Sequence, residues 1–157
     1  MSQEMDIRQM IMEEYQQSVK PLMVYLPWLE QHSGREGYTV YGSDGIRENS
    51  LSFPVYDGTL MKFVRQAANT SLMDRNYRYV YTRNHLADHD LERRAVRNAT
   101  YKDWGLLKGV LSYYVMGGRV KGNLWSEAVK EDLFYLVLLQ MKKIVEQWDK
   151  SVDLQKD

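Results

Sequence analysis

The chain has 157 residues, with 21 basic and 21 acidic side chains that give a formal net charge of zero, and it contains no cysteine. The lack of cysteine excludes disulfides, cysteine-based zinc sites, iron–sulfur ligation and thiol nucleophiles. A chain of this length can fold as one domain without a disulfide or a metal, and we expect a single domain over residues 1–157 in which 149–157 form a frayed tail.

The first 34 residues show the spacing of two short helices. Apolar residues recur every fourth position, as on one helix face, at Ile7, Ile11, Tyr15 and Val19. Pro21 suits the first turn of a second helix, because its missing N–H costs nothing there. Pro27 should kink or shorten that helix, and Ser33-Gly34 should end it.

Between residues 38 and 56 the pattern changes to the alternation of a strand. Apolar and polar residues alternate around Tyr38 and Val40 and again around Phe53 and Val55, with turn residues at 42–45. The segment therefore predicts a short hairpin. Because Pro54 cannot donate a ladder hydrogen bond, its strand should be an edge, and two strands alone are stable only when packed on helices.

Helical spacing returns after Asp57, which is a good N-cap. The run Tyr77–Tyr81 fits either a strand, where Tyr77, Tyr79 and Tyr81 share a face, or a helix, where only Tyr77 and Tyr81 do. Asp88 or Asp90 should cap the helix that follows.

The second half of the chain holds the strongest apolar pattern. One helix face carries Trp104, Leu107, Val110, Leu111 and Tyr114. Gly117-Gly118 should close this helix, and Asn123 should begin another. The run Leu133–Leu139 is apolar on nearly every side, which indicates a buried helix at the centre of the fold, packed on the helix before Gly117.

Nothing in the sequence indicates a membrane or a secretion signal. The longest apolar run, Leu133–Leu139, is far shorter than the ~20 residues of a membrane span. The first six residues carry Glu4 and Asp6 and no apolar signal core. We therefore expect a cytoplasmic protein that does not contact a membrane.

Two histidines stand four residues apart, at His85 and His89, which is a spacing that can hold a metal on a helix. Leu86 stands where metalloproteases carry their catalytic glutamate. If Asp88 caps a helix, then His85 lies outside that helix and the metal-binding geometry is lost. We therefore expect solvated loop histidines and no metal.

A glycine-rich corner at 117–122 includes Arg119 and Lys121 and leads into the helix at Asn123. Converging backbone N–H groups and two cations could hold an anion. The corner lacks the spacing of a phosphate-binding loop and does not follow a strand, which favours a structural turn.

Charge is unevenly distributed: residues 62–122 hold 12 basic and 5 acidic side chains, whereas residues 1–61 hold 4 and 9. Aromatic rings among arginines suit single-stranded nucleic acid. The same cations can instead be neutralised by the acidic ends of the chain or be solvated, as we expect for Arg93, Arg94 and Arg97. No nucleic-acid module is recognisable, and the isoelectric point near 6.8 is low for one.

Three segments carry a resemblance to a known family. They are 51–64 around Pro54, 107–122 around the glycine corner, and the C-terminal helices 124–129 and 133–144. Over about residues 20–148 the chain is similar to an uncharacterised bacterial domain-of-unknown-function family. It departs from that family at Val120, where an aromatic residue is expected, and near Asp132, where a glycine is expected. The resemblance implies no activity.

These patterns predict a mainly α-helical protein, a compact bundle of five to seven helices with a small two-stranded β element packed on it. The leading functional hypothesis is a non-enzymatic interaction or adaptor protein that binds another protein or a second copy of itself. An alternative is a nucleic-acid or phosphate-ligand binder; a second is an enzyme of unidentified type, although no catalytic residue or cofactor is apparent. The candidate contacts for an anionic ligand or nucleic acid are Arg75, Arg78, Arg119 and Lys121, with the aromatic residues Tyr77, Tyr79 and Tyr81.

Overall fold

The fold is described from a computed structural model over residues 3–34, 38–41 and 53–156. These residues are mainly helical, as the sequence predicts. In chain order the elements are α1 (Gln3–Glu14), a π-helical turn (Tyr15–Val19), a 3-10 helix (Lys20–Tyr25), α2 (Leu26–Gln31), β1 (Tyr38–Tyr41), β2 (Phe53–Tyr56), α3 (Gly58–Ala68), α4 (Tyr77–Arg83), α5 (His89–Arg97), a 3-10 turn (Tyr101–Asp103), α6 (Trp104–Gly117), α7 (Leu124–Lys130) and α8 (Leu133–Lys156).

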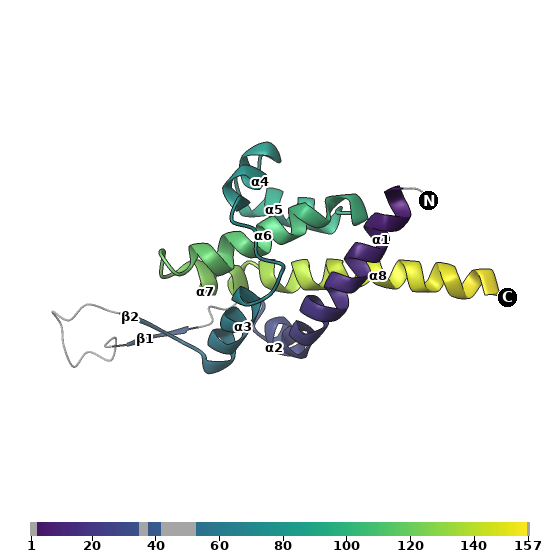
Figure 1. The fold of residues 1–157 in the computed structure, drawn as a ribbon. Coiled ribbons are helices and arrows are strands. Elements are labelled where there is room, and N and C mark those ends of the chain that lie inside the picture. The colour runs from purple at the N-terminus through teal and green to yellow at the C-terminus, as the bar shows by residue number, and fades with distance from the viewer. Residues whose placement is uncertain (1–2, 35–37, 42–52, 157) are drawn as a thin grey trace.

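The centre of the bundle is the pair of helices α6 and α8. Figure 1 shows α8 running along the long dimension of the molecule with α6 beside it, while α1, α2 and α3 cover the other side. On α8, Phe134 is 1% exposed and Leu138 is fully buried, and Leu136 packs partly buried against the core. The expected apolar face of α6 is also buried, at Trp104, Leu107, Val110, Leu111 and Tyr114. The predicted central position of the 133–139 segment is therefore confirmed.

Helix ends lie where the capping residues predict them. The Asp57 carboxylate accepts the Thr59 backbone N–H at 2.7 Å and begins α3. The Asp88 carboxylate accepts the Leu91 N–H at 2.8 Å and begins α5. Gly118 is the C-cap of α6. Each cap satisfies backbone groups that a helix end leaves without partners, so these boundaries follow from local chemistry.

The N-terminal helical stretch is divided into short pieces. A π-helical turn follows α1, and Pro21 lies at the start of the 3-10 helix that follows. Pro27 lies in the first turn of α2, where it ends the preceding piece at Tyr25 and costs no helical hydrogen bond. The shortening predicted from Pro27 is therefore confirmed.

The ambiguous run at 77–81 is helical. Tyr77 and Tyr81 lie on one face of α4, and both rings contact Tyr113 of α6, with centroids 5.7 and 4.3 Å away. Tyr79 lies on another face and is 65% exposed. Packing against α6 therefore decides between the strand and the helix that the sequence allowed for this run.

Strands β1 and β2 pair antiparallel, with Tyr38 opposite Tyr56 and Tyr41 opposite Phe53. Figure 1 shows the two strands extending beyond one end of the helices rather than lying on them, so the predicted packing of this element on the bundle is wrong. The helices close the core among themselves, as where the Phe63 ring of α3 meets Phe134 at 4.9 Å between centroids. The expected turn residues 42–45 and Leu51 lie outside the described residues.

Helix α8 ends at Lys156, so it includes most of the segment 149–157 for which the sequence predicts fraying. Within the described ranges, no helix has both the length and the apolar character that a membrane span requires.

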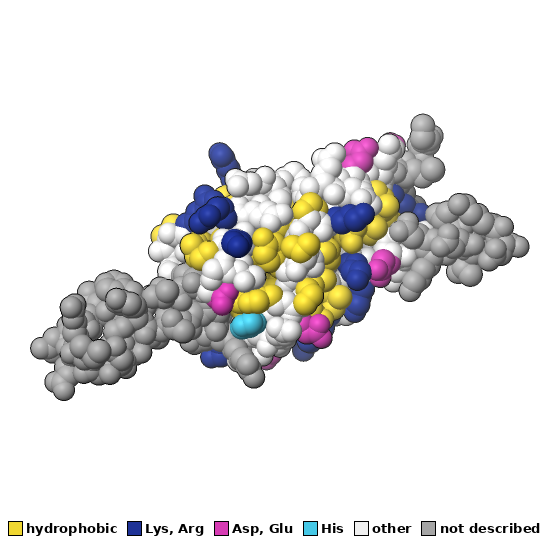
Figure 2. All heavy atoms as spheres, turned by 90° about the horizontal axis from the view of Figure 1, so that it is seen from below, with side chains coloured by type: hydrophobic (Ala, Val, Ile, Leu, Met, Phe, Trp, Pro, Cys, Tyr) yellow, Lys and Arg dark blue, Asp and Glu magenta, His cyan; other side chains and the backbone are white. Residues whose placement is uncertain are grey.

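Several large apolar side chains are exposed, and Figure 2 shows hydrophobic side chains gathered across the middle of the face seen from below. The most exposed are Met10, Val24, Tyr79 and Val120.

Glycine at position 109 permits the close contact of α4 with α6. A Cβ built on Gly109 would lie 2.6–2.9 Å from three side-chain carbons of Val80, whereas one built on Gly105 of the same helix meets nothing within 4 Å. We expect Gly109→Ala to lower the free energy of unfolding by about 1–3 kcal/mol, because α4 must shift. Gly105→Ala, the matched control, should raise it by up to ~1 kcal/mol through helix propensity. Urea unfolding measures both, and equal stability of the two variants contradicts the close approach.

Candidate functional site

A cleft of about 550 Å³ opens where α4, α5, α6 and α7 meet. We call it the polar cleft, because a hydrogen-bonded group of ionisable and hydroxyl side chains forms its wall. Those side chains are Tyr81 of α4, His89 and Glu92 of α5, Tyr114 of α6 and Glu127 of α7. Four helices that are distant in sequence therefore contribute to one site.

Glu92 is the innermost member of this group and is only 3% exposed. One carboxylate oxygen accepts the hydroxyl of Tyr81 at 2.5 Å and that of Tyr114 at 2.7 Å. The other lies 2.7 Å from Nδ1 of His89. A buried carboxylate is costly unless it is paired and hydrogen-bonded, and here three donors on three helices meet that requirement.

His89 lies between two carboxylates. Its Nδ1 faces Glu92, and its Nε2 lies 2.6 Å from Oε1 of Glu127. An ionised carboxylate only accepts hydrogen bonds, so a ring that bonds two ionised carboxylates must donate from both nitrogens, which requires the imidazolium form. Burial lowers the pKa of His89, but the hydrogen bonds to Glu92 and Glu127 outweigh burial and raise the pKa above its ordinary 6.5. The two hydrogen bonds therefore favour the protonated form of the His89 ring.

The tyrosines of the cleft remain protonated donors. Burial, and then the charge of Glu92, raise the pKa of Tyr81 and of Tyr114 well above the ordinary range. Burial also raises the pKa of Tyr113, whose ring stacks on Tyr81 at 4.3 Å between centroids. The hydroxyls of Tyr81 and Tyr114 therefore hold the Glu92 carboxylate in one position across the usual pH range.

The expectation of two solvated loop histidines is wrong for His89 and fits His85. Asp88 caps α5, which makes His89 the first residue of that helix and leaves the exposed His85 outside it, at φ 54°. The i,i+3 spacing of His89 and Glu92 was a local signal of their contact. The contact with Glu127, 38 residues further along, follows only from the packing of α7 on the bundle.

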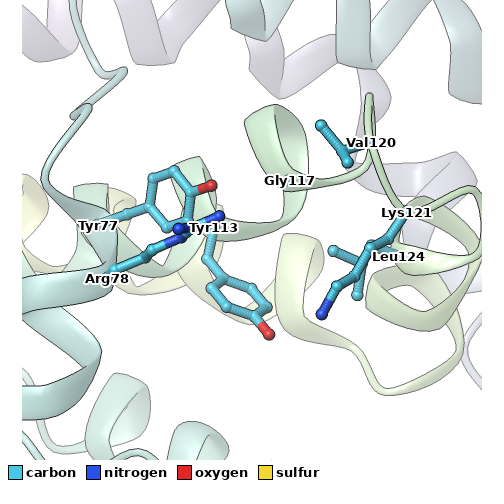
Figure 3. Close-up of a pocket in the computed structure, with 7 residues that line it drawn as sticks. All are labelled: Tyr77, Arg78, Tyr113, Gly117, Val120, Lys121 and Leu124. Atoms are coloured by element: carbon cyan, nitrogen blue, oxygen red, sulfur yellow. The ribbon is translucent and has the colours of Figure 1, made fainter.

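A smaller pocket of about 80 Å³ adjoins the polar cleft. We call it the basic pocket. Figure 3 shows Arg78 and Lys121 on opposite sides of it, with Tyr113 between them. The lining residues are Tyr77, Arg78, Tyr113, Gly117, Val120, Lys121 and Leu124. Tyr113, Lys121 and Leu124 also line the polar cleft, so the two hollows share a wall.

The structure separates the candidate residues of the sequence into groups. Tyr77, Arg78 and Lys121 line the basic pocket, while Tyr81 faces Glu92 in the polar cleft. Tyr79 is exposed on another face of α4. Arg75 and Arg119 are exposed and are not among the residues that line either hollow.

Acidic residues neutralise part of the basic segment, residues 62–122, and two of them, Glu14 and Glu131, come from outside it. The guanidinium of Arg93 binds Asp90 at 2.5 Å and Glu131 at 2.6 Å, and its side chain is 22% exposed. Lys108 lies 3.1 Å from Glu14 of α1. The expectation that Arg93 is solvated is therefore wrong, because α7 brings Glu131 against α5, whereas Arg94 and Arg97 are exposed as expected.

Within the described ranges, no group of three or more His, Asp or Glu side chains is arranged to hold a metal ion. The two ring nitrogens of His89 point at different carboxylates, which is hydrogen bonding rather than coordination. No protein-family model, curated protein or solved structure matches the chain. The resemblance to the bacterial family stays a prediction.

The raised pKa of His89 makes the free energy of unfolding depend on pH. The folded state binds this proton more tightly than the unfolded state, so the stabilisation is complete below the ordinary pKa of 6.5 and is lost as the pH rises through the folded pKa. We expect the free energy of unfolding to fall as the pH is raised from 6.5 towards the ordinary tyrosine value of 10, and to fall less in His89→Gln. Denaturant unfolding over that range measures both slopes, with His85→Asn as the control. If His89→Gln keeps the wild-type slope, then the pH dependence of stability does not come from His89.

Proposed function

We propose that this protein binds a small polar molecule in the polar cleft, with the His89–Glu127 pair as the polar contact for that ligand. The observation that carries the proposal is the His89 ring, which lies at the wall of an open cleft with Nδ1 2.7 Å from the buried Glu92 carboxylate and Nε2 2.6 Å from Glu127. The side chains of His89 and Glu127 are 31% and 39% exposed, against 4% for Glu92. The buried end of the group is therefore fixed, while the outer end is accessible.

A purely structural role explains this arrangement less well. Burying an ion pair gives little net stability compared with apolar packing, so stability alone does not require one. Ionisable groups with shifted pKa values in a concave site are typical of binding and catalytic sites. The cleft volume lies within the range of small-molecule sites, about 300–1,000 Å³.

The chemistry of the outer end defines what the cleft can bind. Glu127 offers a carboxylate to an amine or hydroxyl of the ligand, and His89 offers a positioned proton. A ligand that displaces Glu127 from Nε2 of His89 would meet an imidazolium oriented through Nδ1 by Glu92, which is the arrangement of a general acid. Binding is the function that we propose, and proton transfer is within the chemical capacity of the same residues.

A fragment screen tests the proposal. We expect members of a library of small amines, alcohols and carboxylic acids to shift the His89 side-chain resonances and nearby amides in ¹H–¹⁵N spectra. Glu127→Gln keeps the shape but removes the charge, and should weaken such binding by about tenfold or more. The matched control is Glu146→Gln, an exposed carboxylate on α8 beside Lys142. Binding that is equal in both variants, or no shift at His89 with any fragment, overturns the proposal.

A second candidate function, self-association, keeps the interaction hypothesis and rests on exposed apolar side chains. Met10 on α1 is 61% exposed, and Val24 on the 3-10 helix is 72% exposed. A formal net charge of zero leaves little repulsion between two copies of the chain. The cytoplasmic location expected from the sequence also stays a prediction.

Light scattering on a size-exclusion column tests self-association. We expect the mass to rise above that of one chain as the protein concentration increases, and Val24→Lys to restore a single chain by placing like charges in the interface. Lys62→Gln on the exposed side of α3 is a surface control that should leave the mass unchanged. A wild-type protein that stays a monomer at every concentration removes this candidate.

A further inference from the structure

We propose that the basic pocket binds the anionic group of the ligand whose polar part lies in the polar cleft. The ligand class is then a small phosphate or carboxylate that carries an amine or hydroxyl further along the molecule. This inference rests on the proposed function, because it treats the two adjoining hollows as one site.

Cations from two separate elements line the basic pocket, with the Tyr113 side chain between them. Arg78 comes from α4 and Lys121 from the corner between α6 and α7, and Figure 3 shows them on opposite sides. A guanidinium can bind a phosphate or carboxylate through two parallel hydrogen bonds, and an ammonium adds a point charge. An anion bound in the pocket would therefore be attracted by both charges.

Aromatic rings shape the pocket and orient Arg78. The guanidinium carbon of Arg78 lies 6.0 Å from the centroid of the Tyr77 ring, within the range of a cation–π contact. The Tyr77 ring in turn packs edge-to-face on Tyr113. Gly117 adds space, because a Cβ there would lie 3.1 Å from Leu124 Cδ1 and 3.9 Å from the Tyr77 hydroxyl. The pocket is small, which suits one charged group rather than a polymer.

The shared wall allows one ligand to occupy both the basic pocket and the polar cleft. Tyr113, Lys121 and Leu124 line each of them. Arg78 lines the basic pocket but not the polar cleft, whereas Asp88 and Glu127 line the polar cleft but not the basic pocket. A molecule with an anionic group at one end and an amine or hydroxyl at the other matches this distribution of charge.

The same contacts favour a small molecule over nucleic acid. Single-stranded nucleic acid needs exposed rings on which bases stack. Tyr77 and Tyr81 instead pack on Tyr113, while Tyr79 is exposed on a different face. Arg93, one of the arginines of the basic segment, is bound to Asp90 and Glu131.

Titration with ω-aminoalkyl phosphates of increasing chain length tests the inference, with inorganic phosphate and the matching alkylamines as parent probes. For the chain length that fits, we expect tighter binding than for either parent, and amide shifts both at Tyr113 and at His89. Arg78→Gln should weaken the binding of inorganic phosphate about tenfold or more, while the matched control Arg75→Gln should not. Gly117→Ala, which narrows the pocket without changing its charge, should also weaken it. Thermal unfolding establishes that each variant is folded.

The outcomes separate this inference from the proposed function. Amines that shift His89 while no phosphate binds in an Arg78-dependent way overturn the anion pocket and leave the polar cleft standing. Phosphate that binds through Arg78 without any probe shifting His89 retains an anion pocket and overturns the shared site. An equal loss of phosphate affinity in Arg75→Gln and Arg78→Gln overturns the anion pocket, because it shows only diffuse charge attraction. Stronger binding of a single-stranded oligonucleotide, dependent on Arg75 and Arg119 and lost steeply with salt, replaces the small molecule by nucleic acid.

Discussion

The buried carboxylate of Glu92 constrains how four helices meet. It accepts hydrogen bonds from Tyr81 of α4 and Tyr114 of α6, and it pairs with His89 of its own helix, which reaches Glu127 of α7. A charge removed from water is tolerated only while its partners stay in place, so each of these helices must keep its position relative to α5. The constraint that orders the bundle also builds the wall of the polar cleft.

Close contacts at glycine positions shape the basic pocket. Gly109 lets α4 lie against α6, which places Tyr77 and Arg78 beside Tyr113. At the next corner, a Cβ on Gly118 would lie 2.1 Å from Nε1 of Trp125, whose indole donates to the Val115 carbonyl at 3.1 Å. This corner carries Lys121 to the far side of the basic pocket. Gly109 and Gly118 therefore act here by leaving room for neighbouring side chains.

The turn between α7 and α8 connects the end of α2 to the start of the central helix. Asp132 has φ 64°, in the left-handed region that favours glycine. Aspartate is among the residues that tolerate this conformation, and its Oδ2 accepts the Ser33 hydroxyl at 2.8 Å. Gly34 also donates its backbone N–H to the Lys130 carbonyl at 3.1 Å. The end of α2 is thereby attached to the start of the central helix.

Local chemistry in the sequence determined the mainly helical class, the caps at Asp57 and Gly118, and the burial of the 133–139 segment, because capping and helical periodicity act between near neighbours. It narrowed the cap of α5 to Asp88 or Asp90, and the structure shows Asp88. Tertiary packing decided the rest. It chose the helix at 77–81 by placing two tyrosines on Tyr113, and it left β1 and β2 beyond the helices. The polar cleft was invisible from the sequence except for the spacing of His89 and Glu92. Its other members come from distant helices, and a buried charge selects its partners only once the chain has folded around it.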